Sequence, residues 1–175
     1  MAIDESRAFR PIAIALLTVS DTRGPEDDTS GDVLAERIAG AGHVLIARTI
    51  LKDDADLIVE QLRRWIADPT IDAVVSTGGT GLTGRDVTPE ALERVKTRDI
   101  PGFGELFRWV SYQSIGTSTV QSRACAVVAD GTYIFALPGS NGAVRDGWDN
   151  ILAEQLDARN RPCNFVELMP RLREK

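Results

Sequence analysis

The segment Ile71-Asp72-Ala73-Val74-Val75-Ser76-Thr77-Gly78-Gly79-Thr80-Gly81-Leu82-Thr83-Gly84-Arg85-Asp86 joins a short apolar run to a glycine-rich loop. Because the apolar residues are consecutive, residues 71–76 are expected to form a strand that is buried on both faces. The glycines follow the carboxyl end of that strand, which is where ligands bind in open α/β sheets. The segment therefore predicts a parallel sheet with a binding loop at its rim.

The rest of the chain alternates strand and helix patterns on both sides of this segment. Apolar runs occupy residues 12–19, 44–51, 124–129 and 132–137, and the last two flank Asp130-Gly131, a strong hairpin signal. Stretches of helical period lie between the runs, and a final one covers residues 143–155. Crossover helices favour parallel pairing. We predict an α/β fold, a three-layer α/β/α sandwich whose mostly parallel sheet has one antiparallel hairpin strand.

Local signals indicate where the helices begin. Thr29 or Ser30 is expected to cap the first helix, and Asp53 or Asp54 the second. Thr88, followed by a proline and a glutamate, has the order of an N-cap before a short third helix.

Composition and charge exclude several classes of protein. The chain has 175 residues, of which 43% are hydrophobic and 26% charged, and this predicts a single domain over residues 1–175. A net charge of -6 disfavours nucleic acid as a partner. The apolar runs are too short to cross a membrane and no signal peptide is recognisable, so no membrane association and a cytoplasmic location are expected. One histidine, His43, and two separated cysteines supply no zinc site.

The glycine-rich loop has the chemistry of a phosphate site. Consecutive glycines let backbone N–H groups converge on an anion that a Cβ atom would exclude. Thr80 and Thr83 add hydroxyl groups, and Arg85 adds a guanidinium that can form paired hydrogen bonds to phosphate. A glycine-rich turn without a ligand is the alternative. Residues 79–84 have the letters of the dinucleotide fingerprint GxGxxG, but that fingerprint needs its third glycine inside the following helix, whose cap is expected only at Thr88. A Walker loop would need a lysine after Gly84, where this sequence has Arg85.

Two aspartates are candidate magnesium ligands. Asp86 follows the glycine-rich loop, and a carboxylate beside a phosphate repels it unless a divalent cation bridges the two. Asp53 ends the second strand and should reach the same rim, so the pair could hold Mg²⁺ with nucleotide phosphates. The alternatives are an Asp86 that caps the next helix or pairs with Arg85, and an Asp53 that serves as an N-cap.

Two further polar segments follow. Residues 137–142, Leu-Pro-Gly-Ser-Asn-Gly, leave a strand and open a helix, so they either bind a second anion or simply cap that helix. Residues 114–122 are dense in hydroxyl groups and form either a polar pocket wall or a solvated surface.

Several motifs in the same order resemble the molybdenum cofactor biosynthesis MoaB/MogA family. They are TGGTG at 77–81, RDVTPE at 85–90, PGFGE at 101–105, IGTST at 115–119, QSRA at 121–124, LPGS at 137–140 and the tail 155–165. The similarity extends from about residue 12 to 165. The resemblance implies a molybdopterin-binding α/β/α domain that assembles as a homotrimer or homohexamer.

The resemblance also implies an activity, adenylyl transfer, in which molybdopterin phosphate attacks the α-phosphate of MgATP and pyrophosphate leaves. Asp86 and Asp53 would be the catalytic residues and would position Mg²⁺. The implied binding residues are Thr77, Gly78, Gly79, Thr80, Gly81 and Arg85 beside the nucleotide phosphates, and Ser20, Asp21, Pro138, Gly139 and Ser140 in the substrate pocket. Residues 85–89 match the active branch of the family. A non-catalytic molybdopterin-binding or carrier protein of the same pathway is the alternative function.

Aromatic residues on the helix after Pro101 predict a subunit interface. The stripe Phe103, Leu106, Phe107 and Val110 indicates this helix, and Phe103, Phe107 and Val110 are expected to face the core. Trp109 and Tyr112 fall on other faces of the same helix, where large aromatic side chains usually find a partner. A covering loop of the same subunit is the alternative.

Overall fold

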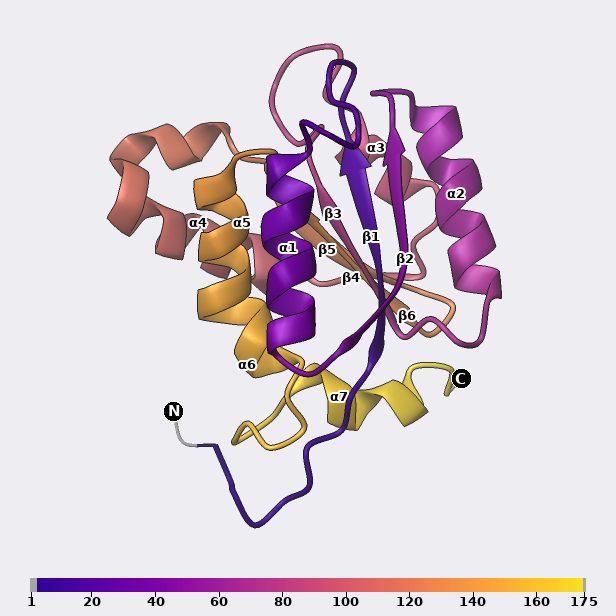
Figure 1. The fold of residues 1–175 in the computed structure, drawn as a ribbon, viewed down its shortest axis with the longest axis vertical. Coiled ribbons are helices and arrows are strands. Elements are labelled where there is room, and N and C mark those ends of the chain that lie inside the picture. Colours follow the sequence, from indigo (N-terminus) through magenta and orange to yellow (C-terminus); the bar gives the residue numbers. More distant parts are fainter. Residues whose placement is uncertain (1–2, 175) are drawn as a thin grey trace.

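A computed structural model, which describes residues 3–174, contains one mixed sheet of six strands with helices on both faces (Figure 1). The strands are β1 (Ala13–Val19), β2 (Val44–Leu51), β3 (Ala73–Thr77), β4 (Arg98–Asp99), β5 (Cys125–Ala129) and β6 (Thr132–Leu137). Their order across the sheet is β2-β1-β3-β6-β5-β4. Neighbours from β2 to β6 are parallel, whereas β5 runs antiparallel to both β6 and β4. The predicted three-layer architecture and its hairpin are confirmed.

The helices divide between the two faces of the sheet. The α-helices are α1 (Thr29–Gly40), α2 (Ala55–Ala67), α3 (Thr88–Glu93), α4 (Pro101–Ile115), α5 (Asn141–Gly147), α6 (Ala153–Gln155) and α7 (Phe165–Leu168). One core lies under α1, α4 and α5 and contains Leu16, Phe107 and Phe135. The other lies under α2 and α3 and contains Leu17 and Leu62. Successive residues of β1 thus enter opposite cores, as the unbroken apolar run predicts.

The N-cap of the first helix lies one or two residues earlier than the sequence indicates. Its N-cap is Asp28, whose carboxylate accepts from the N–H of Gly31 at 3.0 Å, and not Thr29 or Ser30. Asp28 is fully buried because Thr18 and Arg48 also donate to its carboxylate, each at 2.7 Å. Tertiary contacts, absent from the local sequence, therefore select the capping residue among several candidates.

Three other local expectations need correction. Thr88 is the first residue of α3 and not its N-cap, which is Val87 without a side-chain hydrogen bond. The predicted helix 143–155 is interrupted: α5 is followed by a π-helix at Trp148–Leu152 and only then by α6. On α4, Leu106 belongs to the stripe that indicates the helix but is 41% exposed, and the buried residues of the helix are Phe103, Gly104, Phe107 and Ser111. A 3-10 helix, η1 (Gly116–Gln121), continues α4, and another, η3 (Met169–Arg171), continues α7.

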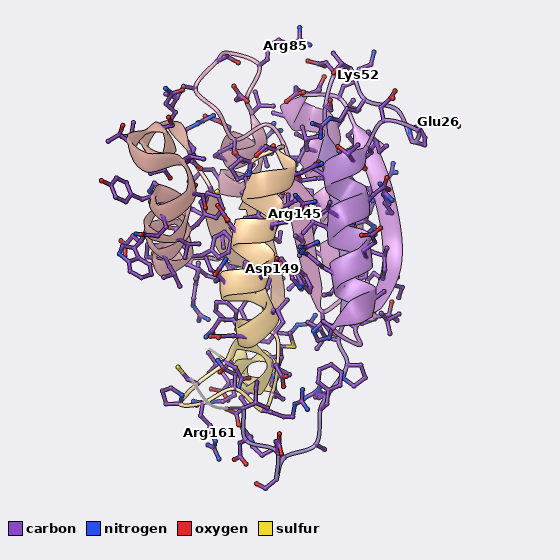
Figure 2. All side chains as sticks on the ribbon, turned by 60° about the vertical axis from the view of Figure 1, so that its left-hand side comes forward. Glu26, Lys52, Arg85, Arg145, Asp149 and Arg161 are labelled. Carbon is purple, nitrogen blue, oxygen red and sulfur yellow. The ribbon has the colours of Figure 1, made fainter. Side chains whose placement is uncertain are left out.

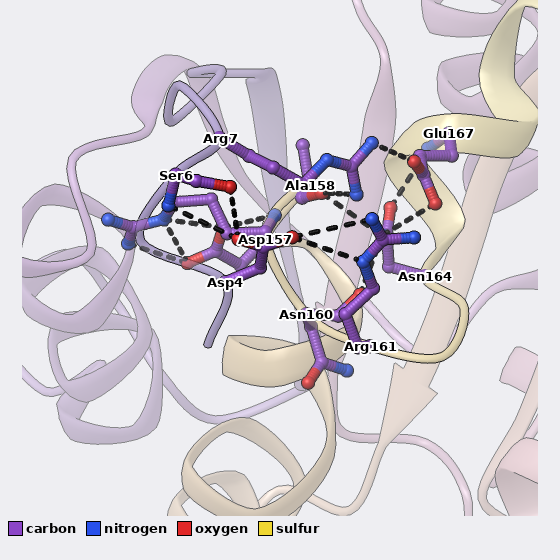
Figure 3. A network of polar contacts seen from close by, with 10 residues as sticks. Asp4, Ser6, Arg7, Asp157, Ala158, Asn160, Arg161, Asn164 and Glu167 are labelled. Carbon is purple, nitrogen blue, oxygen red and sulfur yellow. Dashed lines mark hydrogen bonds and ion pairs between the residues drawn. The ribbon is translucent and has the colours of Figure 1, made fainter. Parts of the chain in front are cut away.

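The N-terminal segment is tied to the C-terminal part of the chain (Figure 3). Arg7 forms an ion pair with Glu167 and donates to the carbonyl oxygen of Ala158 at 2.6 Å. Asp4 pairs with Arg161, 3.3 Å away. This polar network lies at the amino end of β1, opposite the loops that follow the parallel strands (Figure 1).

His43 and the cysteines have structural surroundings. His43 is buried, and its Nδ1 accepts from the N–H of Ile12 at 3.3 Å, in agreement with a structural role. Neither Cys125 nor Cys163 forms a disulfide. Among residues 3–174, no helix combines the length and the apolar character that a membrane span requires.

Candidate functional site

A cleft of about 420 Å³ opens at the carboxyl ends of β3 and β6. Three segments line it: the glycine-rich loop, the loop after β6, and the stretch from the end of α4 through η1. The lining residues are Gly78, Gly79, Thr80, Gly81, Asp86, Phe107, Ser111, Ile115, Ser118, Thr119, Gln121, Ser122, Pro138, Gly139, Ser140 and Ala143. Segments about 60 residues apart in the chain thus meet at the carboxyl ends of two neighbouring parallel strands, the edge at which open α/β sheets bind ligands.

The glycine-rich loop needs glycine at its first two positions for steric reasons. Gly78 has φ +100° and Gly79 has φ +65°, a region that residues with a Cβ atom rarely adopt. A Cβ atom at position 78 would lie 2.1 Å from the carbonyl oxygen of Val19, and one at position 79 would lie 2.3 Å from Oγ1 of Thr88. The loop therefore passes directly over β1 and α3.

The hydrogen bonds of the loop leave backbone N–H groups available. The carbonyl oxygens of Gly78 and Gly79 accept from Thr88, through its hydroxyl at 2.9 Å and its N–H at 3.0 Å. Within residues 3–174, the N–H groups of Gly79 and Thr80 donate to no backbone acceptor. Such exposed N–H groups form the cradle for an anion that the sequence predicts.

Thr77 lies beneath the cleft and does not line it. Its side chain is fully buried, and its hydroxyl donates to the carbonyl oxygen of Pro138 at 3.2 Å. It also lies 3.3 Å from the hydroxyl of Ser30 on α1. Thr77 therefore holds the loop after β6 beside the end of β3 and has no direct access to a ligand.

Asp86 lines the cleft and also closes a turn at the end of the glycine-rich loop. Its Oδ2 accepts from the N–H of Thr83 at 2.9 Å and from the Thr83 hydroxyl at 2.6 Å. These hydrogen bonds, the hydroxyl's foremost, lower the pKa of the Asp86 carboxyl. Neither alternative role is observed, since Val87 is the N-cap of α3 and Arg85 pairs with another residue. Asp86 is thus a charged carboxylate at the rim of the cleft.

Asp53 lies on the other side of the glycine-rich loop. Its Oδ1 would be 3.1 Å from a Cβ atom at position 79, whereas Oδ2 of Asp86 would be 2.8 Å from one at position 81. Asp54 is the N-cap of α2 and accepts from two N–H groups there, so Asp53 does not serve as the cap. The expectation that the two aspartates reach the same rim agrees with this geometry.

The carboxyl group of Asp53 is affected by its burial and by two neighbouring carboxylates. Burial, and then the negative charges of Asp21 and Asp86, raise the pKa of Asp53. Arg85 forms an ion pair with Asp21, and its own side chain is 72% exposed. Figure 2 shows Arg85 and Lys52 at the same end of the molecule, far from Arg161. In this state Arg85 neutralises a carboxylate and does not point to a preformed phosphate position.

Ser20 and Asp21 line a different hollow from Pro138, Gly139 and Ser140. This side pocket, of about 570 Å³, lies between the loop after β1 and the end of β2, and it contains Arg23, Arg48 and Lys52. Arg23 separates it from the cleft, because its guanidinium donates to the hydroxyl of Ser30 at 2.7 Å and to the carbonyl oxygen of Gly139 at 2.9 Å. The expected single substrate pocket is therefore two neighbouring hollows.

The two remaining polar segments are resolved by their contacts. Ser140 is the N-cap of α5 and accepts from the N–H of Ala143 at 3.2 Å, which confirms the capping interpretation of that loop. Residues 114–122 supply much of the polar wall of the cleft, since Ser118, Thr119 and Ser122 line it. The pocket-wall interpretation of this segment is confirmed.

Some contributors to the site were not identified from the sequence. Phe107 and Ser111 form the floor of the cleft, but from sequence they appear only as part of a helix. Arg23 and Arg123 hold the surrounding loops through their guanidinium groups. No local pattern shows which backbone carbonyl a long side chain will reach.

Comparison with known proteins defines the class to which this fold and cleft belong. The sequence profile described as "Probable molybdopterin binding domain" matches residues 15–158, and the chain belongs to this family. The chain is 52% identical over 160 residues to molybdenum cofactor biosynthesis protein B of Escherichia coli (strain K12), covering 91% of this chain and 94% of the relative.

Solved structures agree with this assignment. A crystal structure of a molybdenum cofactor biosynthesis protein B has a TM-score of 0.86 and 34% identity, covering 97% of this chain and 100% of the other. The tungsten cofactor synthesizing protein MoaB from Pyrococcus furiosus has a TM-score of 0.79 and 31% identity, covering 95% and 100%. The resemblance inferred from the sequence motifs is confirmed, and the chain is assigned to molybdenum cofactor biosynthesis.

Proposed function

We propose that the protein binds molybdopterin in the cleft and adenylylates it with MgATP, releasing pyrophosphate. The observation that carries this proposal is the shared lining of one cleft by Gly78–Gly81, by Asp86 and by Pro138–Ser140. An anion cradle and a charged carboxylate therefore face the same space. Adenylyl transfer would use both, since the cradle binds a phosphate group and the carboxylate would help to hold the Mg²⁺ that offsets the repulsion between the two reacting phosphates.

The chain's own residues supply positioning and charge balance. Free N–H groups at Gly79 and Thr80 can donate to phosphate oxygens without a Cβ atom in the way. The hydroxyl groups of η1 and Ser122 line the opposite wall and suit a polar pterin. Arg85 can exchange Asp21 for a phosphate, because its guanidinium is exposed and fits phosphate oxygens in pairs.

The donor set fits Mg²⁺ that arrives with the nucleotide. Oxygen ligands suit Mg²⁺, and Oδ1 of Asp86 is left free by the bonds that Thr83 makes to Oδ2. Burial, and then the negative charges of Asp21 and Asp86, raise the pKa of Asp53, and a bound cation would offset these charges. Residues 3–174 contain no group of three or more acidic, histidine or cysteine side chains placed to hold a metal. Bound Mg²⁺ would therefore need phosphate oxygens to complete its coordination and would neutralise the reacting phosphates.

Assembly as a homotrimer or homohexamer is part of the same proposal. On α4 and η1 five large apolar side chains are exposed: Leu106, Trp109, Tyr112, Ile115 and Val120. Ile115 also lines the cleft. An exposed apolar surface of this kind favours association between subunits.

Incubation of the purified protein with molybdopterin and MgATP tests the proposal. Adenylylated molybdopterin and pyrophosphate are expected in equal amounts, with no product when Mg²⁺ is chelated. Tight binding of molybdopterin without pyrophosphate release would contradict the enzyme and support the alternative, a non-catalytic binding or carrier protein. Failure to bind molybdopterin would contradict both functions.

A further inference from the structure

Arg123 holds the glycine-rich loop from the side that faces away from the cleft. It follows η1 and precedes β5, and its guanidinium lies against residues 81–90. Its neighbours Gln121 and Ser122 line the cleft, whereas Arg123 lines only the shallow hollow behind the loop. Arg123 is therefore placed to shape the loop without touching a ligand.

Three loop carbonyl oxygens accept hydrogen bonds from this one residue. The N–H of Arg123 donates to Thr80 at 3.0 Å, Nε donates to Gly81 at 2.6 Å, and Nη2 donates to Asp86 at 2.6 Å. Nη1 forms an ion pair with Glu90 on α3. The planar guanidinium thus fixes both ends of the turn that contains Thr83.

These bonds determine which way the loop's peptide groups face. Thr88 binds the carbonyl oxygens of Gly78 and Gly79, and Arg123 binds those of Thr80 and Gly81. Four successive carbonyl oxygens are therefore engaged by protein donors. A peptide whose carbonyl is held on one side directs its N–H to the other, so the N–H groups of Gly79 and Thr80, which donate to no backbone acceptor among residues 3–174, remain available to an anion.

We infer that Arg123 is a positioning residue that keeps the glycine-rich loop and Asp86 in the shape that receives phosphate. Its action is indirect: the ligand contacts the loop, and the loop is held by Arg123. The part concerning ligand affinity rests on the proposed function. The part concerning loop shape does not.

Amide hydrogen exchange in the ligand-free protein tests the shape directly. In the loop, the N–H groups of Thr83 and Asp86 are hydrogen bonded at 2.9 and 3.0 Å and should exchange slowly. In Arg123→Gln, exchange at these two positions should accelerate about tenfold or more, with the β3 and β6 amides unchanged. In Arg123→Lys, which has one ammonium group in place of a planar fork, the acceleration should be smaller.

Binding of MgATP tests the consequence. The dissociation constant should rise about tenfold in Arg123→Gln and less in Arg123→Lys, because misplacing a binding loop costs affinity without removing a contact. Two controls separate positioning from general stability. Glu90→Gln removes the ion pair but leaves the three carbonyl bonds, so loop exchange should stay near that of the wild type. Arg159→Gln removes an arginine of equal exposure, 32% against 31%, that pairs with Asp157 far from the loop.

The outcomes are distinguishable. Unchanged loop exchange in Arg123→Gln, or equal acceleration in Arg159→Gln, overturns the inference. A loosened loop with unchanged MgATP affinity overturns its second part. If the wild type does not bind MgATP, the proposed function fails, and the exchange data alone still decide whether Arg123 shapes the loop. Should Arg123→Gln not fold, Arg123→Lys provides the same comparison.

Discussion

Thr83 donates two hydrogen bonds to a single oxygen of Asp86, from its N–H at 2.9 Å and from its hydroxyl at 2.6 Å, both to Oδ2. The carboxylate is therefore oriented by the loop that precedes it, and the bonds from Thr83 leave Oδ1 unused. One residue combines a structural bond with an unused charged oxygen. This division suggests substitutions that separate the two roles.

Asp86→Asn should remove the charge and keep the shape. The amide carbonyl can still accept from Thr83, so the loop should persist, whereas Mg²⁺ loses a negatively charged ligand and no longer bridges the reacting phosphates as well. Turnover of molybdopterin should fall by about two orders of magnitude or more, with molybdopterin affinity retained. Steady-state assays and equilibrium binding measure the two quantities. Asp54→Asn, an N-cap substitution outside the cleft, is the control, and unchanged turnover in Asp86→Asn would reject the role.

Three glycines of one loop should respond differently to a side chain. Gly81→Val places a Cβ atom 2.8 Å from Oδ2 of Asp86, so nucleotide affinity should fall more than the unfolding midpoint. At Gly84 no atom lies within 4 Å, and Gly84→Ala should change neither quantity. Gly78→Ala meets the backbone at 2.1 Å with φ +100° and should destabilise the fold by about 2–4 kcal/mol.

Calorimetry and nucleotide titration on the same samples check this series. If Gly81→Val loses stability and affinity in the proportion seen for Gly78→Ala, the loop is only a structural turn. The prediction then fails even though the steric argument at position 78 holds.

His43 should make the stability of the protein depend on pH between about 7 and 5. Burial lowers the pKa of His43, and its neutral ring accepts from the N–H of Ile12. A histidine whose pKa is lowered by folding stabilises the native state above its unfolded value of about 6.5, and this contribution is lost as the pH falls below that value. The melting temperature should therefore decrease as the pH is lowered from about 7 to about 5.

His43→Gln keeps a hydrogen-bond acceptor but does not titrate, so its melting temperature should depend less on pH. Because the chain has one histidine, the difference between the two curves belongs to that side chain. Parallel curves for the two proteins would show that His43 does not contribute.

Trp109 should lie in a subunit interface. Its side chain is 66% exposed and that of Tyr112 is 53% exposed, so no segment among residues 3–174 covers them. Trp109→Glu would place a charge in the expected contact and should shift the protein toward monomers. Sedimentation equilibrium measures the change. A monomeric wild type, or a folded variant with unaltered mass, would contradict the prediction.

The sequence predicts the strands well and the polar contacts poorly. Residues 44–51 and 132–137 form strands with the expected bounds, because apolar runs between turn residues have few other arrangements. The N-cap of α1 cannot be predicted locally, because Asp28 is distinguished from Thr29 and Ser30 by hydrogen bonds from Thr18 and Arg48, which are distant in sequence. Local rules rank such candidates as equals.

The candidate site shows the same division. The glycine-rich loop and Asp86 were identified from residue type and from their place after a strand. The partner of Arg85 and the separation of the two hollows by Arg23 depend on where long side chains end, which is a property of the packed structure. Motifs locate the rim, and tertiary contacts determine its shape.

The polar network between the N-terminal segment and residues 157–167 has a practical consequence. Both described ends of the chain lie toward the end of the molecule opposite the loops that follow β1 and β3 (Figure 1). An affinity tag, a fluorophore or a surface linkage fused to either end would therefore stand away from the glycine-rich loop. Molecules attached in this orientation would present the glycine-rich loop to the solution, which suits binding measurements on a surface.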